Sequence, residues 1–232
     1  NAKVTLENRG KEKYDILKEL QDVLKMDKLP RKIETYDISN ISGTNMVAGM
    51  CVLQDGVINK KMSRRFKIKT VFGQDDPKCM EEVITRRLKH SIENPEGGFG
   101  KLPDAIFVDG GITQIKAAKQ AISKYSEINV LVYGMVKDDK HTTRALIDEN
   151  KNEIKISKSL MNLITQFQNT VHETAIEYHR KLRAKEMIAS ELDDIEGIGE
   201  TKRNLLLKKF GSVEKIKQAS VDDLTKVKGI SV

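Results

Sequence analysis

The amino-acid sequence predicts an α/β fold, a mixed sheet flanked by helices, which is followed by a small all-α domain. Two observations support this prediction. Over residues 31–188, short apolar segments typical of strands alternate with segments of helical spacing. From residue 189 on, the chain is rich in Gly and Lys and has no segment of strand character. We therefore expect a helix within residues 1–30 that packs on a domain of residues 31–188, and a separate helical domain over residues 189–232.

A helix, three strands and a second helix are predicted in the first part of the chain. Apolar residues recur at helical spacing between residues 5 and 27, and Pro30 then ends the helix. The pair Asp55-Gly56 is a strong turn signal between the second and third apolar runs. Because short connections join the three strands, we expect an antiparallel meander. The expected strands span residues 32–39, 46–53 and 60–70, and the helix after them spans residues 76–93.

Strands and helices alternate in the remainder of the large domain. A strand, a helix and a second strand in succession predict a parallel pair with a right-handed crossover. A meander followed by such an alternation is typical of the ribonuclease H-like fold. The expected elements are strands at residues 104–108 and 129–135 with a helix at 113–125 between them, a hairpin at 145–147 and 153–156, and a long helix at 158–188.

The composition of the chain indicates what kind of partner it binds and in which compartment it works. The net charge of +7 and the pI of about 9.2 favour a polyanionic partner. No apolar run is long enough to span a bilayer, so we expect no membrane partner. Cys51 and Cys79 have no metal-type spacing and indicate buried or half-buried residues in a reducing, cytoplasmic compartment. The chain does not begin with Met, and we expect part of a longer protein. Tryptophan is absent and aromatics are few, so base stacking is not expected to be the main binding mode.

Two carboxylates stand out by their position in the predicted sheet. Asp37 lies in the first strand, and Asp109 comes directly after the strand at residues 104–108. Sheets with crossover helices place ligand sites outside the carboxyl ends of their strands. Two carboxylates there can share a hard cation such as Mg²⁺ or Mn²⁺, which prefers oxygen ligands. The alternative is that Asp109, before Gly-Gly, is a turn residue that caps the next helix.

Histidines and a basic loop are further candidates for this site. His172 and His179 are two turns apart on the long predicted helix, so they share one face. Either can be a ligand or a proton-transfer group, or simply a surface residue. The loop at residues 137–144 offers Lys, His, Thr and Arg to phosphates, and it can also be a solvated loop. Arg64 and Arg65, in a strongly charged strand, can either widen a phosphate-binding surface or form a solvated face.

The C-terminal segment carries a doubled pattern typical of helix-hairpin-helix DNA binding. The turn Gly197-Ile198-Gly199 precedes an amphipathic helix, where outward-pointing amides can hold a DNA phosphate beside Lys202 and Arg203. A second copy at residues 224–230 contains Gly229, and this copy is expected to be truncated, because the sequence ends at Val232. The alternative is a small helical bundle with glycine turns. The residues expected to contact DNA are Gly197, Ile198, Gly199, Lys202, Arg203, Gly229, Arg64 and Arg65.

Six segments in order, followed by the hairpin pattern, resemble the UvrC family of excinuclease proteins. The resemblance covers nearly the whole chain. It implies a ribonuclease H-like endonuclease that makes the incision on the 5′ side of a lesion in double-stranded DNA, with UvrB as its partner in the DNA complex. The segments are I-E-T-Y-D-I-S-N-I-S-G-T (33–44), R-R-F-K-I-K-T-V (64–71), D-D-P-K-C-M-E-E-V-I-T-R-R (75–87), P-D-A-I-F-V-D-G-G-I-T-Q (103–114), G-M-V-K-D-D-K-H-T-T-R (134–144) and V-H-E-T-A-I-E-Y-H-R (171–180).

The resemblance also implies roles for single residues. The family's catalytic Asp, Asp and His match Asp37, Asp109 and His172, which would also hold Mg²⁺ or Mn²⁺. The family has an acidic residue three places before the catalytic His and an Arg after it, whereas this chain has Asn169 and Glu173. Two alternatives to the excinuclease remain open: a DNA-binding scaffold without catalysis, and a junction resolvase that uses carboxylates without a His. The supporting site residues implied by the family are Lys137, His141, Arg144 and Asn169.

Overall fold

The computed structural model describes residues 2–40, 46–96, 99–138 and 143–230. Contacts divide the chain into two compact units, Asn1–His179 and Arg180–Val232, and each is described by itself. Helix α4 (Lys158–Asp193) crosses the division between the two units. Among the described residues, no helix is both long enough and apolar enough to cross a bilayer.

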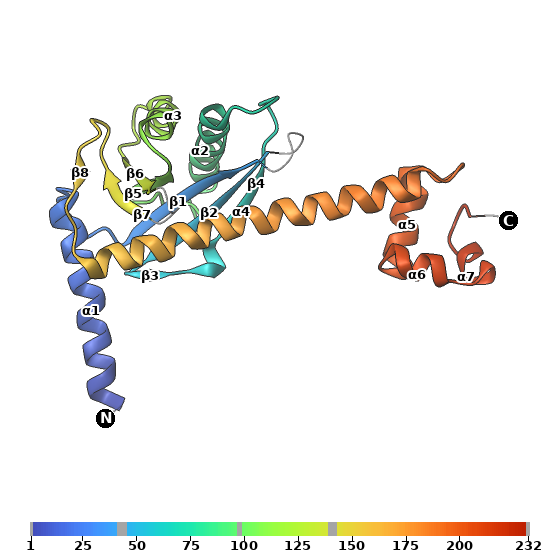
Figure 1. The fold of residues 1–232 in the computed structure, drawn as a ribbon, viewed down its shortest axis with the longest axis horizontal. Helices are drawn as coiled ribbons and strands as arrows, with labels where there is room; N and C mark the ends of the chain where they lie inside the picture. The colour runs from blue at the N-terminus through green and yellow to red at the C-terminus, as the bar shows by residue number, and fades with distance from the viewer. Residues whose placement is uncertain (1, 41–45, 97–98, 139–142, 231–232) are drawn as a thin grey trace. The chain divides into compact units, whose positions relative to one another are not determined.

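An eight-stranded mixed sheet is the centre of the first unit (Figure 1). The strand order is β3-β2-β1-β5-β6-β7-β8, and β4 also pairs with β2. Strands β1 and β2 are antiparallel, while β1, β5 and β6 are parallel neighbours. These pairings confirm the predicted meander and the predicted parallel pair. The strands are β1 (Lys32–Ser39), β2 (Val47–Gln54), β3 (Val57–Ile58), β4 (Arg64–Lys67), β5 (Ala105–Asp109), β6 (Leu131–Lys137), β7 (Thr143–Ile147) and β8 (Glu153–Ile154).

Helices cover the two faces of the sheet and create two apolar cores. Side chains of successive strand residues point to opposite faces, so β1 sends Tyr36 to one core and Ile33 to the other. Helices α2 (Asp76–Glu93) and α3 (Ile112–Ser123) pack on the first face. Helix α1 (Ala2–Val23) and the first part of α4 pack on the second face, where Cys51 is buried. Both cysteines are free, and both are buried, in agreement with the predicted buried or half-buried positions.

The third strand is shorter than the sequence predicts. Asp55 and Gly56 have φ values of +48° and +75°, which gives the predicted tight turn. However, residues 60–70 do not form one strand. The Asn59 side chain accepts a hydrogen bond from the Lys61 amide and starts a one-turn 3-10 helix, Lys60–Met62, before β4 begins at Arg64. A local side-chain hydrogen bond therefore replaces strand pairing at this sheet edge.

Helix α4 approaches the sheet very closely at Gly49 of β2. A Cβ atom at this position would lie 2.6 Å from the Val171 carbonyl oxygen and 2.9 Å from the Ala175 amide nitrogen. Only glycine leaves room for this approach. Gly49 pairs with Asp37 across β1 and β2, so the close contact brings α4 onto the sheet beside that carboxylate.

Among its described residues, the second unit contains the end of α4 and three short helices around a small apolar core. The short helices are α5 (Glu200–Phe210), α6 (Val213–Gln218) and α7 (Val221–Thr225). Leu206, Ile216 and Val227 are buried together in this core. No strand is present among the described residues of this unit, as predicted for the C-terminal segment.

Candidate active site

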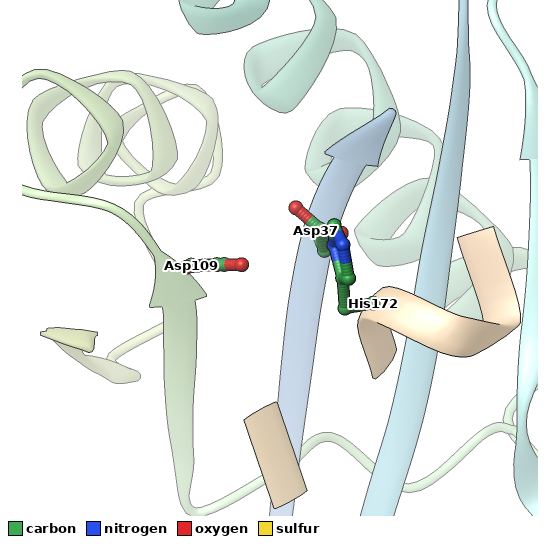
Figure 2. A group of neighbouring side chains, drawn as sticks. All are labelled: Asp37, Asp109 and His172. Atoms are coloured by element: carbon green, nitrogen blue, oxygen red, sulfur yellow. The ribbon is translucent and has the colours of Figure 1, made fainter. Parts of the chain in front are cut away.

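Three side chains distant in sequence converge at one edge of the sheet. Tyr36 pairs with Val108, so Asp37 and Asp109 stand level on the neighbouring parallel strands β1 and β5. His172 reaches them from α4. Figure 2 shows the imidazole of His172 against Asp37, with Asp109 directed toward both from the end of β5. Each residue offers one ligand atom, and these atoms all lie within 4.8 Å of one another.

This donor set fits a divalent metal ion. Two carboxylates supply hard oxygen ligands, and an imidazole nitrogen is accepted by Mn²⁺ and other first-row ions. The Asp37 side chain is only 7% exposed, whereas that of His172 is 48% exposed. The three groups therefore combine a rigid, buried carboxylate with an imidazole that a substrate can reach. The sequence singled out these three residues, and the structure places them together.

The protonation of Asp37 and His172 is linked through a direct contact. His172 Nδ1 lies 2.7 Å from Asp37 Oδ2. That hydrogen bond raises the pKa of His172, and partial burial of the ring opposes the rise. Burial raises the pKa of Asp37, the His172 hydrogen bond lowers it, and the charge of Asp109 adds to the rise. A cation placed between the carboxylates would remove this repulsion.

Asp109 is held by two further side chains. Lys137 Nζ donates to Asp109 Oδ2 at 2.7 Å, so this residue of the predicted basic loop lies in the site. Gln168 Nε2 donates to Asp109 Oδ1 at 2.6 Å and to the Met135 carbonyl oxygen at 3.1 Å. The Thr143 hydroxyl in turn donates to Gln168 Oε1. Gln168 is fully buried, so these hydrogen bonds form away from solvent.

Sequence reasoning missed Gln168. The available signal was its spacing: it precedes His172 by four residues and therefore lies on the same face of α4. A glutamine on the buried face of a helix must find hydrogen-bond partners, which points to a polar group beneath it.

The other predicted site residues lie in varied surroundings. Arg144 forms an ion pair with Glu153 on the adjacent strand, with 2.7 Å between the charged atoms. Asn169 is exposed on α4, and His179 is 4% exposed and thus buried. His141 falls outside the described residues. The structure therefore brings Lys137 to the three central residues and engages Arg144 elsewhere.

A cavity of about 370 Å³ with polar and charged lining residues lies between β4 and α4. Both predicted arginines of β4 border it. Arg65 forms an ion pair with Glu177 at 2.9 Å, and the Arg64 guanidinium lies 3.9 Å from the centre of the Phe99 ring. The cavity is lined by Lys60, Ser63, Arg64, Arg65, Thr170, Glu173, Thr174 and Glu177.

The two predicted hairpins of the second unit have the same backbone structure. Gly197 and Gly229 both have positive φ, +82° and +88°. In each turn, the amide of the following isoleucine donates to the carbonyl three residues earlier, at 3.0 Å. Lys202 lies close to the second turn, because its Cε would be 3.7 Å from a Cβ at Gly229. Within this unit, the first hairpin's cation and the second hairpin's glycine therefore lie side by side.

Comparison with known proteins agrees with the two-part organisation of the chain. Residues 21–176 match the model of the UvrC RNase H endonuclease domain. This chain belongs to the UvrC family. Residues 189–232 of this UvrC-family chain match the SAM-like helix-hairpin-helix tandem. The mixed sheet described above is thus a ribonuclease H-like fold followed by a small helical region, as predicted.

Curated relatives of this UvrC-family member match all or nearly all of its sequence. UvrABC system protein C of Clostridium novyi is 44% identical, over 100% of this chain and 40% of its own length. UvrABC system protein C of Alkaliphilus oremlandii is also 44% identical, over 94% of this chain and 37% of its own length. The chain thus spans about 40% of the length of such relatives. The crystal structure of human ENDOV aligns with a TM-score of 0.41 and 10% identity, over 66% of this chain and 86% of that one.

Proposed function

We propose that this chain is the part of an excinuclease that cuts DNA on the 5′ side of a lesion during nucleotide excision repair, with a divalent metal ion. Its family membership supports a nuclease. The observation that carries the proposal is the convergence of Asp37, Asp109 and His172 within 4.8 Å. The cut is made on damaged double-stranded DNA to which UvrB is already bound. UvrB supplies the selection of the lesion, and this chain supplies the hydrolysis.

Asp37, Asp109 and His172 would hold Mg²⁺ or Mn²⁺, which polarises a phosphodiester and lowers the pKa of an attacking water. The chain's own groups prepare the site. Lys137 and Gln168 each bind one oxygen of Asp109 and so fix the plane of its carboxylate. The contact between Nδ1 of His172 and Asp37 orients the ring and leaves Nε2 either to bind the metal or, in place of that role, to take or give a proton at the DNA.

The second unit would bind the duplex through phosphates. The amides of the two glycine turns, with Lys202 and Arg203 at the start of α5, are suited to phosphate oxygens and read no base sequence. The net charge of +7 of the whole chain favours a polyanionic partner but does not assign the contact to this unit.

One feature favours a second candidate function, a DNA-binding module without catalysis. Glu173 follows His172 directly in the sequence and adds a negative charge to the cavity between β4 and α4. A scaffold would need the hairpins but no hydrolysis. The junction-resolvase alternative differs in another way, because it predicts that His172 contributes nothing to the cut.

An incision assay separates these candidates. The substrate is a lesion-containing duplex with UvrB bound and with a nick already present on the 3′ side, so that only the 5′ cut is scored. We expect the wild-type protein to cut with Mn²⁺ and the Asp37→Asn and His172→Ala variants not to cut. Asp55→Asn is the matched control and should cut normally. Asp55 lies in an exposed turn after β2, at the end of the β1–β2 pair that is farther from Asp37.

Each alternative outcome has a definite meaning. Loss of the cut with Asp37→Asn but not with His172→Ala supports a resolvase-type site. Wild-type protein that binds the complex without cutting it supports the scaffold. Anomalous scattering from a crystal soaked in Mn²⁺ tests metal binding directly, and a peak bonded to Asp37 and Asp109 is expected.

A further inference from the structure

The loop between β4 and α2 displays an aromatic ring in solvent. Phe72 is 92% exposed, whereas the other exposed large apolar side chains described in the structure range from 37% to 58%. A single exposed apolar residue is common on protein surfaces and is not by itself a binding site. Three properties of the loop distinguish Phe72 from such residues. The base of the loop is fixed, the loop lies at the end of the sheet that carries the candidate active site, and exposed lysines are close to Phe72 in the sequence.

The base of this loop is fixed to helix α2. The Glu82 carboxylate accepts hydrogen bonds from the amides of Lys69 and Thr70 and from the Thr70 hydroxyl. Arg86 Nη1 donates to the Lys67 carbonyl oxygen at 2.8 Å. At the other end, the Asp75 side chain caps α2 by accepting from the Lys78 amide. Because both ends of the loop are held, the ring of Phe72 is presented from a defined support.

The loop lies at the edge of the sheet that carries the candidate active site. Lys67, the last residue of β4, pairs with Val47, and Val47 pairs with Ser39 of β1. Ser39 comes two residues after Asp37. The chain therefore leaves β4 at the end of the sheet that holds Asp37 and Asp109, and Phe72 follows five residues later.

Two lysines precede the ring in the chain, and Asp75 and Asp76 follow it. Lys67 and Lys69 are exposed, and the ion pairs of the described residues include neither of them. An exposed aromatic ring beside lysines is the combination that proteins use for single-stranded nucleic acid: the ring stacks on a base, and the cations bind the backbone phosphates.

We propose that Phe72 stacks on an unpaired nucleobase of the DNA that enters the active site, while Lys67 and Lys69 bind the adjoining phosphates. This inference depends on the proposed function in one respect, because it assumes that the ligand is DNA. It adds a contact to the base itself, which the phosphate contacts of the hairpins do not supply. The loop would thus favour DNA that is opened near the position of the cut.

The absence of tryptophan from the chain makes a direct test possible. In the Phe72→Trp variant the indole is the sole tryptophan, and its emission reports stacking. The variant is titrated with a duplex containing a six-base bubble, and with the fully paired duplex, in EDTA so that no cutting occurs. Val57→Trp is the matched control, because Val57 is also exposed but pairs with Gln54 near the opposite end of β2.

We expect the bubble to quench the Phe72→Trp emission strongly, with little quenching by the paired duplex and none in Val57→Trp. In binding assays, Phe72→Ala should raise the Kd for the bubble about tenfold, within the range that a lost base stack produces. Phe72→Tyr should bind as the wild type does, and the Kd for the paired duplex should change little in either variant.

The proposal is overturned if Phe72→Ala binds the bubble as tightly as the wild type, or if both duplexes quench the indole equally. Quenching or a blue shift caused by UvrB alone, without DNA, would also overturn it and identify the loop as a protein-docking site. These measurements need no incision. A protein that stacks on the bubble but never cuts would refute the proposed function and leave this inference standing.

Discussion

Replacing Gly49 with alanine tests whether the contact between α4 and β2 sets the geometry of the active site. The new Cβ would lie 2.6 Å from the Val171 carbonyl oxygen, and an ordinary contact begins near 3.4 Å. Both neighbours within 3.0 Å are backbone atoms of α4, so no side chain can rotate away to make room. The helix and the strand must therefore separate by about 0.8 Å at this point.

This separation acts directly on the candidate site, because Val171 precedes His172 and Gly49 pairs with Asp37. If the shift is transmitted in full, the 2.7 Å contact between His172 Nδ1 and Asp37 Oδ2 lengthens to about 3.5 Å. That distance is too long for a useful hydrogen bond. Overpacking of this kind also costs roughly 1–3 kcal/mol of folding free energy.

The assay combines a thermal melt with a Mn²⁺ titration followed by electron paramagnetic resonance. Gly49→Ala should lower Tm by roughly 2–4 °C for each kcal/mol lost, and Mn²⁺ affinity should fall in the protein that remains folded. Gly10→Ala is the matched control, because nothing lies within 4 Å of its new Cβ and alanine favours the helix. A Gly49→Ala variant with wild-type Tm and Mn²⁺ affinity would refute the reasoning.

Three further predictions concern single groups. Replacing Gln168 with Leu keeps the volume but removes the hydrogen bond to Asp109, so Mn²⁺ affinity measured by calorimetry should fall about 10- to 100-fold; unchanged affinity would show that Lys137 suffices. The Asp37 contact raises the pKa of His172, so its contribution to stability is complete below the ordinary histidine pKa and is lost as pH rises through the raised value. Mn²⁺ affinity should change in the opposite direction and increase over the same pH range, because the metal displaces the proton; an affinity that stays flat as pH rises above the ordinary histidine pKa would contradict this. Replacing Lys202 with Ala should weaken binding to any duplex alike and reduce the slope of log K against log salt by about one, as measured by fluorescence anisotropy; a loss restricted to one sequence would argue against phosphate binding.

Local signals explain where the sequence predicted the fold well. Helix α2 begins and ends as predicted, at residues 76 and 93, because Asp75 caps its start and Pro77 occupies its first turn. The third strand was predicted less well. Its alternation of charged and apolar residues has strand character, yet the pattern does not reveal that Asn59 caps a 3-10 turn there. Whether an edge segment pairs depends on its neighbours, which local spacing does not contain.

Some residues of the candidate site could likewise be identified from the sequence, and others could not. Asp37 and Asp109 could be found because acidic residues at strand ends are conspicuous among apolar neighbours. The contact of Gln168 with Asp109 could not be predicted, since it depends on the angle at which α4 crosses the sheet. Arg144 is the reverse case, because its sequence position suggested a role in the site that its contacts do not show. It matches a basic loop in sequence, but its side chain pairs with Glu153 on the next strand.

The first unit places control of both carboxylates on one short segment of α4. Gln168 and His172 are four residues apart and face the sheet together, one binding Asp109 and the other Asp37. Val171, between them, is the residue whose carbonyl oxygen lies against Gly49. A displacement of this segment therefore changes the environment of both carboxylates at once. The pairing of β1 with β5 fixes the spacing of the two carboxylates, and α4 orients them. The geometry of the site therefore depends on the contact between α4 and Gly49.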